Sequence, residues 1–283
     1  MAIAFALVSL AFAGLIDVVF KRYSSEARSR GTYIMGIGAV WTVLQLAIVL
    51  ASGKPIRLDG QTLAFGVAAG LLVSMANLLL IESLTHIDVG MASTIYRLNS
   101  IAVVALAVGL LGETLTAIKV TGVLLGIMAV LVLYEPQPAR GLHRLLLRYF
   151  LLAIAAALLR AGFGVLTKAA VLQGLDLQLV LLVNGPVWVV AGAAYALLRE
   201  PGFRITRAKV QYSVLSGVLI CAIANFLMLA LERGEASVVV PIANMSFLVA
   251  TLISVALRME RFTTRKLVAM ALTVAAIVVL SLA

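Results

Sequence analysis

The sequence is poor in charge and in the residue types that build metal or redox centres. Only 12% of its 283 residues are charged, about half the share of a typical soluble protein. It has one cysteine, Cys221, and two histidines, His86 and His143. These counts exclude an internal disulfide and leave no cluster of Cys or His ligands for a metal ion. We therefore expect no metal site and no cofactor.

Further absences argue against an enzyme or a nucleotide-driven pump. A membrane-embedded hydrolase would need a nucleophile with a base, or a cluster of His and acid, and two histidines do not supply one. The nucleotide-binding pattern G-x-x-x-x-G-K-[ST] does not occur either. Any transport would have to run on a gradient or be passive.

Apolar residues, in contrast, make up 63% of the chain and give it a mean hydropathy of +1.14. They gather in ten runs near the ~20 residues that a helix needs to span a bilayer. Backbone groups in lipid must pair within their own segment, and the runs lack the alternation of a membrane β-barrel. The predicted fold class is an all-α integral membrane protein with ten transmembrane helices, at Ala2–Phe20, Thr32–Ser52, Thr62–Leu84, Val89–Leu111, Ala117–Tyr134, Leu147–Leu172, Leu177–Leu198, Tyr212–Leu231, Ser237–Leu257 and Leu267–Leu282.

A polar linker divides these helices into five and five. We predict a first five-helix repeat at residues 1–134, a linker at 135–146 and a second repeat at 147–283. Because five is odd, the second copy enters the bilayer from the opposite side. The result is an inverted-topology repeat, an arrangement that makes alternating access around a central site possible.

Polar landmarks recur in both halves. Lys21 and Glu113 are 92 residues apart, and so are Lys168 and Glu260. An Ala-Asn pair falls between the two landmarks each time, at Ala76-Asn77 and Ala224-Asn225. We expect Glu113 and Glu260 to organise helix-joining turns by capping, since each precedes Thr and an apolar run.

Three motifs resemble the drug/metabolite transporter superfamily in its ten-helix EamA-like form. They are GETLTAIKVTGVLLG (Gly112–Gly126), GEASVVVPIANMS (Gly234–Ser246) and RMERFTTRK (Arg258–Lys266). The last departs from the usual Gly-Glu by having Met259 before Glu260. The resemblance implies a secondary transporter whose central cavity is lined by helices one to four and six to nine, with helices five and ten peripheral.

Positive charge is distributed unevenly over the loops. Of the 22 Lys and Arg residues, fifteen lie in the loops after helices one, five, seven and nine, and five lie on the opposite side. The positive-inside rule makes the first side cytoplasmic and puts both termini outside the cell membrane, which we take to be a bacterial inner membrane. Members of the superfamily are commonly described with their termini inside, so the two criteria conflict, and we follow the count. The net charge of +10 then faces lipid headgroups, and the expected partners are the bilayer and a small-molecule substrate, not nucleic acid.

Arg97 lies at mid-depth of the predicted fourth helix, with Ser93 and Ser100 on its face. Such a stripe should point into the bundle, where the guanidinium can bind both oxygens of a carboxylate. The alternative is a structural ion pair with Asp17 of the first helix. The two can coexist, because a pair that opens to admit substrate is itself a gate. Tyr96 beside it is a candidate aromatic wall.

Asp17 and Lys21 are candidates for coupling or gating. Lys21 follows Asp17 by one helical turn and could neutralise it. Alternatively, a carboxylate inside the membrane can take up and release a proton, which proton coupling needs.

Arg160 is about 13 residues into the sixth helix, with Gly164 and Lys168 on its face. An unpaired cation facing a cavity would favour a carboxylate or phosphate on the substrate. The competing interpretation is snorkelling of the side chain toward headgroups, which mid-depth makes costly.

The remaining candidates for substrate binding are three amides, Asn77, Asn225 and Asn244, and the aromatic Trp188. Each amide can bind substrate or merely a neighbouring helix. Asn244 stands out because Pro241 interrupts the hydrogen bonding of the ninth helix, and broken helices are where transporter sites form. Trp188 follows Asn184 and Pro186 and can line a cavity or pack in the core.

The function predicted from the sequence is a secondary transporter that exports or exchanges small metabolites by alternating access. Two arginines inside the membrane favour zwitterions or organic anions such as amino acids. The alternative is an exporter of lipophilic cations, which would need Asp17 free of Arg97. A GxxxG at Gly122 and Gly126 is compatible with a monomer or a homodimer.

Overall fold

The computed structural model describes residues 1–24, 29–53, 55–83, 96, 99–132, 143–200, 205–257 and 262–283, without the side chains of Lys21, Ser24, 143–146 and Ser254. Arg97 and Glu260 lie outside the described residues, as does any side-chain contact of Lys21. Within these ranges the secondary structure is helical, which confirms the predicted fold class. Six of the helices are long and apolar enough to cross a membrane, and so is the combined run of the ninth span at Ala236–Ile253.

The helices follow the predicted apolar runs closely. Their bounds are α1 Ala2–Ser24, α2 Arg30–Ala51, α3 Gly60–Ser83, α5 Asn99–Leu111, α6 Ala117–Val132, α7 His143–Leu172, α8 Leu177–Arg199, α9 Arg207–Arg233, α10 Ala236–Asn244, α11 Phe247–Ala256 and α12 Thr264–Leu280. Two differences stand out: α7 begins inside the predicted linker, and the ninth run forms two helices, α10 and α11.

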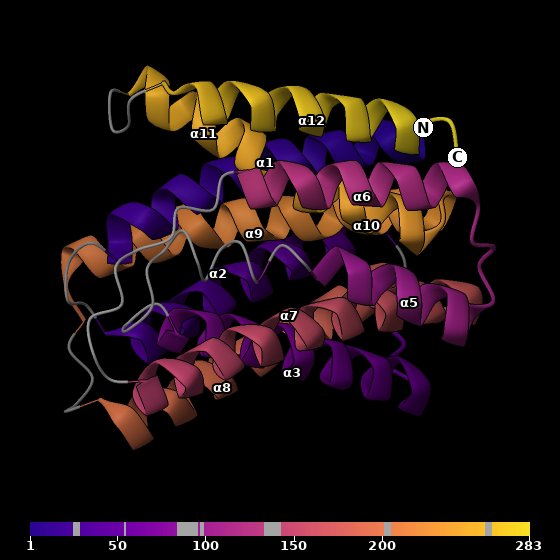
Figure 1. Ribbon diagram of the computed structural model, residues 1–283. Coiled ribbons are helices and arrows are strands. Elements are labelled where there is room, and N and C mark those ends of the chain that lie inside the picture. The colour runs from indigo at the N-terminus through magenta and orange to yellow at the C-terminus, as the bar shows by residue number, and fades with distance from the viewer. Residues whose placement is uncertain are drawn as a thin grey trace.

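The helices lie roughly along one direction, and both chain termini are at the same end of the bundle (Figure 1). A chain that crosses the membrane an even number of times must have both of its termini on the same side. The helices α6 and α12 pack on each other at one side of the bundle, as expected for peripheral fifth and tenth helices.

Two pairs of helix caps recur in both halves at an offset of 147 residues, the offset that relates Lys21 to Lys168 and Glu113 to Glu260. At each position a side-chain oxygen accepts a hydrogen bond from a backbone N–H in the first turn, which satisfies a donor that has no partner inside the helix. The matched caps are Asp59 on α3 with Thr206 on α9, and Thr116 on α6 with Thr263 on α12.

The helices α2 and α8 are equivalents in the two halves, and they run antiparallel in close contact. A Cβ on Gly38 would lie 2.7 Å from the Val189 nitrogen, and one on Gly185 would lie 3.0 Å from the Thr42 nitrogen. Because equivalent helices run in opposite directions, the repeat is inverted.

Trp41 and Trp188 mark the symmetry axis. They are also 147 residues apart, and their rings meet edge to face with centroids 5.7 Å apart. Equivalent residues can touch only near the axis that relates them. Both rings are nearly inaccessible, at 1% and 2% exposed, so they form the packed centre of the α2–α8 contact.

The GxxxG of the fifth span is used within the monomer. A Cβ on Gly122 would lie 2.6 Å from Leu280 of α12, and one on Gly126 would lie 2.7 Å from the end of the Met245 side chain. The small residues therefore let α6 approach its own neighbours.

Replacing Gly38 by Ala should destabilise the protein. The new methyl would overlap the α8 backbone at Val189, which cannot move aside as a flexible side chain would. We expect the free energy of unfolding to fall by about 1–3 kcal/mol, measured by thermal unfolding in detergent with the fluorescence of Trp41 and Trp188 as the signal.

The matched control is Gly109→Ala, because no atom lies within 4 Å of that position. Alanine is favoured over glycine inside a helix, so this variant should be as stable as the wild type or more so. Equal losses in the two variants would contradict the packing explanation.

Candidate functional site

The ninth span is broken near its middle. Helix α10 ends at Asn244 and α11 begins at Phe247, and the Met245 N–H bonds to the Ile242 carbonyl at 3.0 Å, a tighter turn than an α-helix makes. Pro241 lies inside α10 and has no N–H to donate. The interruption predicted from Pro241 is therefore present, and it falls four residues later in the chain.

Polar side chains from two other helices meet this break. The Ser246 hydroxyl donates to the Asp17 carboxylate of α1 at 3.0 Å. The Asn244 amide donates to the Asn99 side-chain oxygen of α5 at 2.5 Å, and it is 3.4 Å from the Ser100 hydroxyl. The break thus gathers an acid, two amides and two hydroxyls.

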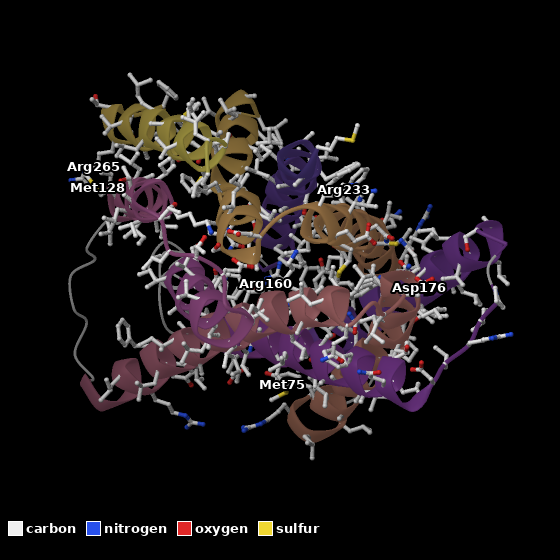
Figure 2. All side chains as sticks on the ribbon, turned by 90° about the vertical axis from the view of Figure 1, so that its right-hand side faces the viewer. Met75, Met128, Arg160, Asp176, Arg233 and Arg265 are labelled. Carbon is white, nitrogen blue, oxygen red and sulfur yellow. The ribbon has the colours of Figure 1, made fainter. Side chains whose placement is uncertain are left out.

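Arg160 of α7 lies at the same depth along the bundle as this break. On α7, Lys168 bonds to the carbonyl of Gly234, and a Cβ on Gly164 would lie 3.3 Å from Val240. The two helices therefore run antiparallel here, and one further turn of α7 places Arg160 at the depth of Asn244. Viewed along the bundle, Arg160 is near its centre (Figure 2).

The Arg160 guanidinium is half-buried and lies over the Phe163 ring of its own helix, 5.5 Å from the centroid. This is a cation–π distance. Among the described residues no carboxylate pairs with it. Its charge is available to an anionic group in the middle of the bundle.

We call these side chains the break site: Asp17, Asn99, Ser100, Arg160, Asn244 and Ser246. Three of the predicted residues belong to it: Asp17 and Asn244 bond at the break itself, and Arg160 lies at its depth on α7. Tyr96 is half-buried three residues before Asn99. The role of Arg97, two residues before Asn99, stays a prediction because it lies outside the described part of the chain. Sequence reasoning did not select Asn99 or Ser246, because neither the spacing nor the residue type shows which helix these side chains meet.

Asn225 belongs to a different group of polar side chains. Its amide donates to the side-chain oxygen of Gln45 at 2.9 Å and to the Cys221 carbonyl at 2.8 Å. Gln45 is fully buried and donates in turn to the Gln178 side chain at 2.6 Å. Gln45, which sequence reasoning missed, thereby links α2, α8 and α9.

Asn77 and Trp188 also have contacts within the protein. The Asn77 amide donates to the Val73 carbonyl of its own helix at 2.7 Å, and Trp188 packs on Trp41. Both contacts fit the alternative interpretation, in which these two side chains have a structural role and do not bind substrate. Asn184 differs from them: it is fully buried, and neither its amide nitrogen nor its oxygen has a partner among the described residues.

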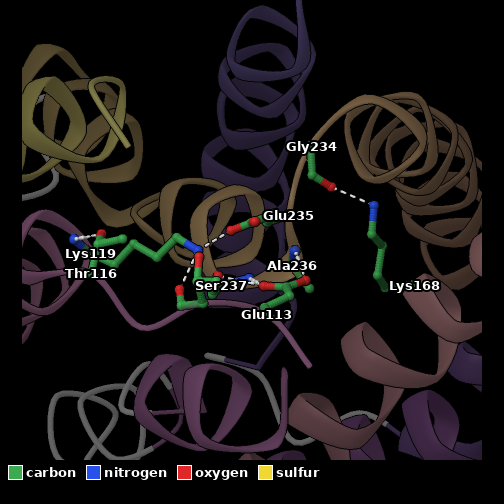
Figure 3. Close-up of polar contacts among 9 residues, drawn as sticks. Glu113, Thr116, Lys119, Lys168, Gly234, Glu235, Ala236 and Ser237 are labelled. Atoms are coloured by element: carbon green, nitrogen blue, oxygen red, sulfur yellow. Dashed lines mark hydrogen bonds and ion pairs between the residues drawn. The ribbon is translucent and has the colours of Figure 1, made fainter. Parts of the chain in front are cut away.

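At the end of the bundle near the chain termini, Glu113 caps a helix of the other half (Figure 3). Its carboxylate accepts from the N–H groups of Ala236 and Ser237, at 2.7 and 2.9 Å, and from the Ser237 hydroxyl. The prediction that Glu113 acts as a cap is confirmed, and the capped helix is α10 rather than its own. An anionic group suits the positive end of a helix dipole.

Lys168 and Lys119 complete this end of the bundle (Figure 3). The Lys168 ammonium donates to the carbonyls of Leu231 and Gly234, both at 2.7 Å, at the carboxyl end of α9. The buried Lys119 pairs with Glu235. Together with Glu113, these residues secure the α9–α10 turn, so we call the set the turn clamp.

A second acid secures α2 from the other half. The Glu200 carboxylate accepts from the N–H groups of Arg30 and Gly31, both at 2.6 Å, at the start of α2. The Arg30 side chain pairs with Glu82 at 2.8 Å, and the Tyr195 hydroxyl donates to the same carboxylate at 2.6 Å. Sequence reasoning missed Glu200, because it follows a run of apolar residues and looks like an ordinary loop acid.

Comparison with known proteins agrees with this architecture. Residues 1–135 match the EamA-like transporter family. No curated protein matches the chain. A solved structure described only as "Crystal structure of protein" superposes with a TM-score of 0.85 at 18% sequence identity, over 99% of this chain and 96% of the other. At that identity the likeness shows the fold alone.

Replacing Glu113 by Ala should leave the N–H groups of Ala236 and Ser237, both of which are fully buried residues, without their acceptor. We expect a loss of about 1–3 kcal/mol in the free energy of unfolding, the penalty for a buried unsatisfied group, measured by thermal unfolding in detergent.

Glu232→Ala is the control for Glu113→Ala, because Glu232 pairs with Arg233 on the exposed surface. Surface pairs contribute about 0–1 kcal/mol, so this variant should unfold close to the wild type. A Glu113→Ala protein as stable as Glu232→Ala would refute the cap.

Proposed function

We propose that the chain is a secondary transporter moving small metabolites by alternating access, on the premise that residues 1–135 match the EamA-like transporter family. The observation that carries the proposal is the break site. Transporters with inverted repeats bind substrate near the midplane, at discontinuous helices. Here the α10–α11 discontinuity lies in the middle of the bundle with an acid, an arginine and two amides at its level.

The chemistry of the break site favours a zwitterion or an organic anion, such as an amino acid. The guanidinium of Arg160 would bind the substrate carboxylate, for which it offers paired donors. Asp17 would bind an ammonium group, and the Asn99–Asn244 pair would exchange its mutual bond for bonds to the substrate. Arg97 would add a second cation.

Asp17 is also the proposed coupling residue. A carboxylate inside the membrane changes the local charge when it gains or loses a proton, and intramembrane acids commonly serve as proton relays. Its bond to Ser246 at 3.0 Å ties that change directly to the α10–α11 break.

The proposed orientation places the loop between α8 and α9 in the cytoplasm and both termini outside. Its support is the positive-inside rule and the fifteen basic residues on the first side against five on the second.

The transport proposal is tested with purified protein in proteoliposomes, supplied with a panel of radiolabelled amino acids and other small metabolites. Arg160→Ala should reduce uptake of an anionic or zwitterionic substrate by about 10- to 100-fold, the range expected when a charge-assisted hydrogen bond is lost. Arg160→Lys should retain part of the activity, because it keeps the charge and loses the fork of donors.

Arg207→Ala, at the exposed start of α9, is the matched control and should leave uptake unchanged. Asp17→Asn should abolish the dependence of uptake on a pH gradient, and it should weaken the exchange of a zwitterionic substrate, because the variant lacks the carboxylate proposed to bind the ammonium group. Wild-type activity in Arg160→Ala, Arg97→Ala and Asp17→Asn would refute the site. Transport of lipophilic cations that needs Asp17 and not Arg160 would instead establish the alternative cargo.

The orientation is tested by labelling single cysteines in a Cys221→Ser background with a membrane-impermeant maleimide. In intact cells, a cysteine at the exposed Ile56, between α2 and α3, should react. One at the exposed Ile205, before α9, should react only after the membrane is opened. The reverse result would place the termini inside.

A further inference from the structure

A large groove runs along the outside of the bundle, separate from the break site. It has a volume of about 900 Å³ and lies between α3, α7 and α8. Met75 of α3 lines it and lies at the outer edge of the bundle in the end-on view (Figure 2). Most of the lining is leucine, valine and alanine, and several of these side chains are well exposed, among them Leu71, Val190 and Leu198.

The groove is long and closely packed at its base. A Cβ on Gly66 would lie 2.6 Å from Val183, and one on Gly70 would lie 2.9 Å from Val187, so these glycines hold α3 directly against α8. The lining on α3 extends from Leu63 to Glu82, about 28 Å at the rise of an α-helix. It therefore covers nearly the ~30 Å thickness of the hydrocarbon core.

One end of the groove carries net positive charge. Arg148, near the start of α7, and Arg199, at the end of α8, line it there and are exposed. Within the described part of the chain neither has a hydrogen bond or an ion pair. The acid at this end, Glu82, is already paired with Arg30 and with the Tyr195 hydroxyl. At the other end, Leu58 and Leu63 are apolar.

We propose that this groove is a binding site for an anionic phospholipid. An acyl chain lies along the apolar groove, and the phosphate binds Arg148 and Arg199. Two exposed guanidinium groups suit a phosphate in both charge and geometry. Tyr195 lines the groove at the same end, where its hydroxyl bonds to Glu82, and aromatic side chains are common at the level of lipid headgroups. The proposal does not depend on the transport function, because lipid binding is measured without substrate.

A second copy of the chain fits this face poorly. A two-fold interface presents the same surface twice, and the described lining has no unpaired carboxylate to meet the two arginines. Burying these cations without a partner would be costly. A lipid supplies both the apolar chain and the missing anion.

The test uses the full-length protein in detergent, stripped of lipid and titrated with palmitoyl-oleoyl-phosphatidylglycerol, with bound lipid counted by native mass spectrometry. The same titration is made with phosphatidylcholine of the same chains and with glycerol phosphate alone. We expect tight binding of one phosphatidylglycerol, weaker binding of phosphatidylcholine, and none of glycerol phosphate.

Two variants separate the roles of headgroup and chain. The double variant Arg148→Gln/Arg199→Gln should weaken phosphatidylglycerol binding by about 30-fold and remove the preference over phosphatidylcholine. Ala194→Trp should fill the groove and weaken binding of both lipids. The controls are Arg207→Gln/Arg265→Gln and Ala271→Trp, which change exposed residues outside the groove lining and should bind as the wild type does.

Several outcomes would overturn the proposal. Equal affinity for the two lipids would show that the arginines do not select the headgroup. Wild-type binding in Ala194→Trp would show that the acyl chain does not lie in the groove. Tight binding of glycerol phosphate would mean a simple anion site. A stable dimer that Ala194→Trp dissociates would assign the groove to a second copy.

Discussion

The structure depends on the rule that a polar backbone group inside the hydrocarbon region must find its partner within the protein. This is hardest at helix ends, where the first N–H groups and last carbonyls have no partner in their own helix. Two helices receive an acceptor at their amino-terminal end from the opposite half of the protein. Glu113 of the first half caps α10, and Glu200 of the second half caps α2. The halves cannot separate without leaving these groups unpaired, so helix capping also holds the bundle together.

The fold was readable from the sequence because lipid leaves few choices. Ten apolar runs had to be helices, and the landmarks Lys21, Glu113, Lys168 and Glu260 marked two copies in opposite directions. The structure adds a reason why such landmarks recur. Glu113 accepts a hydrogen bond at the start of α10, and Lys168 donates one at the end of α9. An apolar side chain could make neither hydrogen bond.

The break site was only partly predictable. Helical spacing shows which residues share a face, but not which helix that face meets, and amides satisfy each other across long stretches of sequence. Asn225 pairs with Gln45, 180 residues away, and Asn244 pairs with Asn99, 145 residues away. Pro241 correctly marked the ninth span as irregular. The break falls at Met245 and Ser246 because a proline removes one hydrogen bond without fixing where the helix must end.

The break site lies where the two halves depart from their own symmetry. At the offset of 147 residues, the counterpart of Arg160 is Ala13 and the counterpart of Asp17 is Gly164. At these two positions, one turn apart, α1 carries an acid and α7 carries a base, and the equivalent position in the other half is a small residue each time. In a strictly symmetric bundle, equivalent positions would carry the same charge, and the two like charges would repel each other across the axis. The bundle instead presents an acid on one helix and a guanidinium on the other, and this difference is the basis for proposing a zwitterionic substrate.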